Sequence, residues 1–168
     1  STTLERFDYH NNIKVYGNAY LQYKPVKGLI LKTSFGGYAS MYDNDFYQSS
    51  LAHNNGQTSG QYKTKKVIDW LNENIATYTP ELGKDHSLSI LAGFTVQRTD
   101  GYSSNMTASG FPTDNIHTLN AGIIKTGTTT ASEELLLSAL GRITYSYKDR
   151  YLASVSSRWD GSSRFGAD

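Results

Sequence analysis

Residues 138–160 read SALGRITYSYKDRYLASVSSRWD, and this stretch decides the fold of the chain. Apolar or small side chains recur at every second position from Ala139 to Tyr147 and again from Tyr151 to Trp159. Such alternation is typical of strands, in which successive side chains point to opposite faces. Only the charged triplet Lys148-Asp149-Arg150 separates the two runs. The stretch therefore predicts two antiparallel strands joined by a compact turn.

The same alternation predicts four earlier strands, at 15–23, 29–41, 66–79 and 88–97. In the strand at 66–79 apolar and polar residues occur on both parities, so its faces stay undecided. Compact turns are expected at 24–28 and 80–86, and long loops rich in Gly, Ser, Thr and Asn at 42–65 and 98–134. The pattern predicts an all-β antiparallel up-and-down meander of about six long strands, with compact turns at one end and long loops at the other.

Composition narrows the class of protein. The chain has 168 residues, a formal net charge of +1 and 18% charged residues, so it has no basic field for nucleic acid. Its 13 Tyr and 15 Gly against 3 Pro favour strands and turns. There is no cysteine, which excludes disulfides and thiolate metal sites. No apolar run approaches 18 residues, which excludes a helical membrane span, whereas barrel strands need only about 9–11 residues.

Tyrosines stand beside the compact turns. Tyr23, Tyr78 and Tyr147 precede a turn, and Tyr151 follows the last one. A tyrosine ring in hydrocarbon with its hydroxyl among headgroups is typical of the aromatic girdle of a membrane barrel. The other explanation is that tyrosine simply favours strands. Together with the alternation of short and long connections, the positions favour a transmembrane barrel wall.

The run SALGRITYSYKDRYLASVSSRWDGSSRFG at 138–166 resembles a signature segment of the SusC/RagA-like TonB-linked outer-membrane proteins, with Leu140 in place of the usual Phe. Other stretches of that resemblance follow in the right order and cover most of the chain: Gly17-Asn18-Ala19-Tyr20, Lys27-Gly28-Leu29, Glu73-Asn74, His86-Ser87-Leu88, Leu91-Ala92-Gly93-Phe94 and Gly110-Phe111-Pro112-Thr113-Asp114.

The resemblance implies that residues 1–168 are an internal part of a 22-stranded barrel domain, with plug, signal peptide and remaining strands absent from the sequence. It implies a transporter of the Gram-negative outer membrane in Bacteroidetes, which imports oligosaccharides or peptides. The implied partners are membrane lipid, a SusD-like surface lipoprotein and the TonB complex, which acts through parts of the receptor outside this chain. Nucleic acid is not an expected partner.

On this interpretation the two parities of each strand meet different solvents. The apolar parity is expected to face lipid, and its representatives are Leu31, Phe35, Ile90, Phe94, Ile143 and Val155. The lumen-facing candidates, with possible ligand contact, are Arg142, Arg158, Asp160, Tyr38, Tyr42 and Tyr47. An arginine on the lipid side near the midplane costs roughly 2–4 kcal/mol, which favours the lumen for the arginines. For the tyrosines, a structural role is the alternative to stacking on sugar rings.

A soluble β-sandwich or meander that binds glycans is the second interpretation. In a sandwich the apolar parity would be buried against a facing sheet, whereas in a barrel wall it would be exposed on the protein surface. Exposure of these side chains therefore separates the two interpretations.

Catalytic and metal sites have little support in the sequence. The four histidines, His10, His53, His86 and His117, are widely spaced, and no nucleophile elbow occurs, so we expect neither an enzyme nor a cofactor. Asp43-Asn44-Asp45 offers oxygen ligands for calcium in an extracellular loop, but the distal Glu of a calcium loop is missing. A solvated turn is the favoured interpretation of this triplet.

Overall fold

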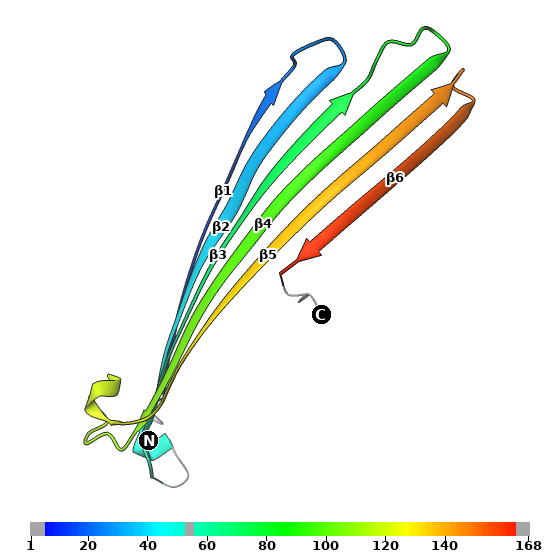
Figure 1. Ribbon diagram of the computed structural model, residues 1–168. Coiled ribbons are helices and arrows are strands. Elements are labelled where there is room, and N and C mark those ends of the chain that lie inside the picture. The colour runs from blue at the N-terminus through cyan, green and yellow to red at the C-terminus, as the bar shows by residue number, and fades with distance from the viewer. Residues whose placement is uncertain (1–5, 53–55, 164–168) are drawn as a thin grey trace. The chain divides into compact units, whose positions relative to one another are not determined.

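The computed structural model describes residues 6–52 and 56–163; His53 and the motif residues Arg164, Phe165 and Gly166 lie outside the described residues. Six strands form one sheet in the order β1-β2-β3-β4-β5-β6 (Figure 1). The predicted all-β meander is therefore confirmed. The strands are β1 (Arg6–Tyr23), β2 (Leu29–Gln48), β3 (Ser59–Tyr78), β4 (His86–Ser109), β5 (Ile123–Tyr147) and β6 (Tyr151–Ser162).

The strands are longer than the alternation predicts. β2 continues to Gln48 and β3 begins at Ser59, while β4 continues to Ser109 and β5 begins at Ile123. The long loops expected at 42–65 and 98–134 are therefore wrong, and the connections are 49–58 and 110–122. Polar residues occupy both faces of the added strand segments, so no hydrophobic period marks them. Backbone hydrogen bonds between neighbouring strands still form there.

The connections contain two single turns of 3₁₀ helix, η1 (Ser50–Ala52) and η2 (Leu119–Ala121). Among the described residues, no helix has the length and apolar character needed to cross a membrane.

The three compact turns lie where the sequence predicts them. Gly28 has a φ of +81°, and a Cβ there would collide with the carbonyl oxygen of Thr79. In the last turn Lys148 and Asp149 both have a φ of 51°, and the Arg150 N–H donates to the Tyr147 carbonyl over 3.1 Å. Two successive positive φ angles are the signature of a type I′ turn, whose twist matches that of the adjoining strands.

The contacts of the chain divide it into two compact units, which are described separately. The loop unit comprises Ser1–Val15, Ala39–Ile68 and Asp100–Ser132, and the turn unit comprises Tyr16–Tyr38, Asp69–Thr99 and Glu133–Asp168. The turn unit contains the three compact turns and all of β6, and the loop unit contains both longer connections.

In the turn unit, the register of β5 and β6 separates apolar from charged side chains. Ile143 pairs with Val155 on one face, while Leu140 pairs with Arg158 on the other. We call the first the apolar face of the turn unit. Its side chains are largely exposed: Phe35 is 55% exposed and Val155 73%. Leu31, Phe94 and Ile143 are exposed too, and Ile90 is half-buried.

No second sheet covers this apolar face in the described part of the chain, because all six strands belong to one sheet. The β-sandwich interpretation is therefore wrong. It required the apolar parity to be buried against a facing layer.

The structure also decides the faces of β3. The rings of Phe35 and Trp70 stack with centroids 5.9 Å apart, which puts the even-numbered residues of β3 on the apolar face. Asn72 and Asn74 share that parity, and each takes part in a chain of hydrogen bonds. The Thr33 hydroxyl donates to Asn74 Oδ1 (2.8 Å), and Asn74 Nδ2 donates to Asn72 Oδ1 (2.7 Å). These bonds lower the cost of placing two amides among apolar side chains.

The loop unit has a small core of its own. Tyr47, Ala108 and Phe111 are buried, and Leu119 and Ala121 pack against them. The ring of Phe111 meets that of Tyr47 edge-on, with centroids 5.1 Å apart. Connection 110–122 therefore folds back onto β2 and β4 and does not extend freely into solvent.

Candidate ligand-binding surface

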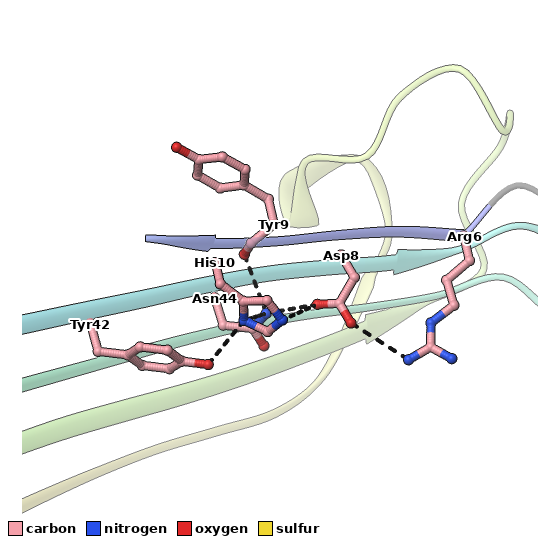
Figure 2. A network of polar contacts seen from close by, with 6 residues as sticks. All are labelled: Arg6, Asp8, Tyr9, His10, Tyr42 and Asn44. Atoms are coloured by element: carbon pink, nitrogen blue, oxygen red, sulfur yellow. Dashed lines mark hydrogen bonds and ion pairs between the residues drawn. The ribbon is translucent and has the colours of Figure 1, made fainter. Parts of the chain in front are cut away.

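A polar network joins β1 and β2 in the loop unit (Figure 2). Asp8 is at its centre: one carboxylate oxygen lies 3.5 Å from the Arg6 guanidinium and the other 3.1 Å from His10 Nε2. Asn44, which is 7% exposed, donates from Nδ2 to the latter oxygen over 3.0 Å. Alternation places Arg6, Asp8 and His10 on one face of β1, and their contacts place Asn44 of β2 on the same face, which we call the polar face of the loop unit. In β3 this face bears the odd-numbered residues, because the even-numbered ones share the apolar face with Phe35.

The hydrogen bonds of the network define which ring nitrogen of His10 accepts a hydrogen bond and which one carries the proton. His10 Nδ1 lies 3.0 Å from the Asn44 amide nitrogen, which can only donate, and 3.1 Å from the Tyr42 hydroxyl. Nδ1 is therefore the acceptor, and the ring proton belongs on Nε2, where it faces Asp8. The Tyr42 hydroxyl then shares the single lone pair of Nδ1 with the Asn44 amide. The network thus fixes the orientation of the Tyr42 ring on the polar face of the loop unit. Tyr42 is one of the residues predicted to face the lumen.

A hollow of about 250 Å³ lies beside Tyr42. Four strands of the loop unit contribute to it, and every lining residue carries a polar group, although carbon atoms of these side chains form much of the wall. Gln61 donates from Nε2 to Asn105 Oδ1 over 3.0 Å and so orients one of the lining amides. The lining residues are Tyr42, Lys63, Thr64, Lys65, Ser103, Ser104, Asn105, Thr128 and Thr130.

Asp114 connects the two longer connections of the loop unit. Its Oδ1 accepts hydrogen bonds from the Tyr47 hydroxyl (2.9 Å) and the Ser50 backbone N–H (3.1 Å), and its Oδ2 accepts one from the Ser50 hydroxyl (2.8 Å). The two Ser50 donors, followed by Tyr47, hold the pKa of the Asp114 carboxyl below its ordinary value, because they favour the ionised form.

No family model matches the chain. Three curated proteins of Formosa agariphila are similar to most of it. TonB-dependent receptor P39 is 36% identical over 152 residues, which are 88% of this chain. TonB-dependent receptor P26 is 28% identical over 170 residues, and TonB-dependent receptor P3 is 26% identical over 153 residues.

The chain belongs to the TonB-dependent receptors. This is the family that the sequence resemblance predicts, and it is a transporter family of the Gram-negative outer membrane rather than an enzyme family. The chain spans 15% or 16% of the length of these curated receptors, so it corresponds to one segment of them.

Solved structures show the same fold. A structure of the RagAB peptide transporter superposes with a TM-score of 0.89 at 21% identity, over 96% of this chain and 19% of the matched chain. Structures of the RagAB peptide importer in its open-open and closed-closed states both superpose with a TM-score of 0.87 at 22% identity. The six strands are therefore arranged as in a segment of these chains.

Not all of the predicted contact residues of this TonB-dependent receptor segment are available to a ligand. Tyr47 is fully buried in the loop-unit core, so the prediction that it contacts ligand is wrong in this structure. The burial of Tyr47 is not predictable, because the sequence does not show that connection 110–122 covers this side chain. Tyr42 is half-buried beside the hollow, and Tyr38 in the turn unit is 41% exposed.

The charged residues predicted to face the lumen differ in their contacts. Arg158 donates from Nε to both carboxylate oxygens of Asp160, each over 2.9 Å, and from a terminal nitrogen to the Ser138 hydroxyl over 3.3 Å. This pair is thus satisfied within the receptor segment. Arg142 is exposed on the same parity.

The triplet Asp43-Asn44-Asp45 lies inside β2, not in a loop or turn as predicted. Alternation puts Asn44 on the face opposite to both carboxylates, so the three side chains do not converge on one ion. In the described part of the chain no group of three His, Asp or Glu side chains is placed to hold a metal.

The four tyrosines predicted at the turns end β1, β3 and β5 and begin β6. His86, which the sequence did not suggest for this group, joins them: its ring lies 5.0 Å from that of Tyr147, and its Nδ1 is 2.6 Å from the Tyr145 hydroxyl. Histidine at the start of β4 thus adds an aromatic ring beside Tyr145 and Tyr147.

Proposed function

We propose that this chain is part of the barrel wall of an outer-membrane importer that takes up peptides or oligosaccharides with energy from the TonB complex. Membership of the TonB-dependent receptors supports the proposal, and so does the close similarity in fold to the RagAB peptide transporter. The observation that carries it is an exposed apolar face opposite a face that bears charges. A wall between hydrocarbon and water needs both.

On this proposal the apolar face of the turn unit contacts lipid. The predicted lipid-facing residues are Leu31, Phe35, Ile90, Phe94, Ile143 and Val155, and five of the six are exposed in the protein alone. Tyr23, Tyr78, Tyr147 and Tyr151 form the girdle at the membrane boundary, where rings meet hydrocarbon and hydroxyls meet water. The charged residues of the compact turns then lie in water beyond that boundary.

The opposite parity lines the passage. Arg142, Arg158 and Asp160 lie on it in β5 and β6, and in the loop unit the network around Asp8 and the hollow beside Tyr42 are both polar. Such a surface keeps water and a polar nutrient in contact with hydrogen-bonding groups. The family resemblance further suggests a SusD-like surface lipoprotein as the partner that captures the nutrient.

Uptake by cells tests the function directly. The gene for the complete receptor is deleted and restored, and the accumulation of fluorescent peptides and oligosaccharides is measured with TonB present and absent. We expect accumulation of at least one of the two nutrient classes to require both the receptor and TonB. Equal accumulation in all four strains would contradict the proposal.

A further inference from the structure

Charge is segregated between the two faces of the loop-unit strands. On the polar face, the described strand residues include four cations, Arg6, Lys14, Lys63 and Lys65, but only one carboxylate, that of Asp8. On the opposite face the charged strand residues are Asp43, Asp45, Asp100, Lys66 and Lys125. The excess of positive charge is therefore confined to the polar face.

The carboxylate of Asp8 is not available to neutralise the lysines, because Arg6, His10 and Asn44 already surround it. No ion pair joins Lys63 or Lys65 to a carboxylate in the part of the chain that the structure describes. The two lysines are two residues apart on one strand, so their Cα atoms are roughly 6.6 Å apart on the same face. Their ammonium groups thus repel each other without a counter-charge.

Both lysines line the hollow beside Tyr42, and the other lining groups add hydrogen-bond donors. Ser103 and Thr130 contribute hydroxyls, whereas the Thr128 hydroxyl donates to the Asn105 carbonyl over 3.5 Å. Asn105 has its Oδ1 occupied by Gln61, which leaves its amide N–H groups to donate. The lining contains no Asp or Glu. A concave site with two cations, several donors and no acid favours an anionic ligand.

We propose that this hollow binds a carboxylate group of the imported substrate, carried either by an acidic peptide or by an acidic sugar. The inference rests on the proposed function, because it assigns the polar face to the transport passage. A volume of about 250 Å³ accommodates one acidic residue or sugar unit rather than a whole oligomer. Lys63 and Lys65 neutralise the carboxylate, and Asn105 and the hydroxyls complete its hydrogen bonds.

Binding to the complete purified receptor tests the proposal with two matched ligand pairs. One pair is an alternating Gly-Asp hexapeptide and its Gly-Asn counterpart, and the other is trigalacturonate and neutral galactotriose. We expect the receptor to prefer the acidic member of one pair, and that pair identifies the source of the carboxylate. The double variant Lys63→Gln/Lys65→Gln is expected to lose about tenfold in affinity for the acidic ligand and to keep its affinity for the neutral one.

Lys66→Gln is the control, since Lys66 is the next residue on the strand and lies on the opposite face. It also removes a lysine charge and is expected to leave both affinities unchanged.

The proposal is overturned if the receptor prefers neither acidic ligand, if the double variant weakens acidic and neutral ligands equally, or if Lys66→Gln matches the double variant. TonB-dependent uptake is measured in parallel: retained uptake without an acid preference rejects only the carboxylate site, and uptake that does not depend on TonB rejects the importer function.

Discussion

The loop unit and the turn unit share the strands β1 to β5 but bury their side chains in different ways. The loop unit encloses Tyr47, Ala108 and Phe111, whereas no apolar side chain is buried in the described part of the turn unit. The turn unit instead exposes Phe35, Ile143 and Val155. On the proposed function, lipid solvates the apolar side chains of the turn unit, so this unit needs no apolar core, whereas the loop unit lies in water and needs one.

The largest effect is expected from removing the core of the loop unit. Phe111→Ala empties a buried position, and such truncations cost about 3–5 kcal/mol in well-packed cores. In the complete receptor we expect connections 49–58 and 110–122 to become accessible to protease while β5 and β6 remain protected. Limited proteolysis followed by mass spectrometry checks this. Cleavage throughout the chain would show that the two units do not differ in the source of their stability.

An intermediate effect is expected on the apolar face of the turn unit. Ile143→Arg places a charge where we propose lipid, at a cost of up to about 2–4 kcal/mol. Thr144→Arg is the matched control, because Thr144 is the next residue and pairs with Ser154 on the other face. The measurement is the urea midpoint of the complete receptor refolded in phospholipid vesicles.

We expect Ile143→Arg to lower that midpoint and Thr144→Arg to leave it nearly unchanged. Equal midpoints for the two variants would mean that the two faces meet the same solvent. The contrast between the units would then need another explanation.

The smallest effect is expected from pH at Asp114 in the loop unit. Because its pKa lies below the ordinary value of 3.8 in the folded protein, the ionised carboxylate stabilises the connection above that pH. This stabilisation is lost as pH falls through the lowered pKa. Hydrogen exchange of the Ser50 and Phe111 amides, corrected for intrinsic rates, is expected to show faster opening in acid.

Asp114→Asn should remove that dependence, since an amide does not titrate and its nitrogen cannot accept from the Ser50 hydroxyl. We expect the variant to open as readily at neutral pH as the unchanged protein does in acid. A variant that retains the acid response would show that another group controls this connection.

Much of the fold was predictable because one alternation of apolar and polar side chains is repeated along the strands. The alternation around Ile143 and Val155 identified two faces, and the residues of the compact turns identified where each strand reverses. The resemblance carried by residues 138–166 identified the family. Gly110-Phe111-Pro112 belonged to that resemblance as well, but nothing in the sequence showed that Phe111 fills a core.

The candidate site was much less predictable. Tyr42 was expected to face a ligand, but Lys63, Lys65 and Asn105 were not recognised, because their segments were expected to be loops. Asp114 and Tyr47 are 67 residues apart in sequence, and only the fold of connection 110–122 brings them together. The one available signal was the pair Lys63 and Lys65, which are two residues apart. This spacing places both side chains on one face only if the segment is a strand.

The sequence by itself determined the strand order, the compact turns and the two faces of the turn unit, because hydrophobic alternation and turn chemistry are local properties. Only the tertiary structure decided how far the polar strands extend and which of their residues meet. Their pairing depends on backbone hydrogen bonds and on register between strands. Where the side chains on both faces are polar, the sequence shows no hydrophobic alternation, so neither the strand nor its faces can be predicted from it.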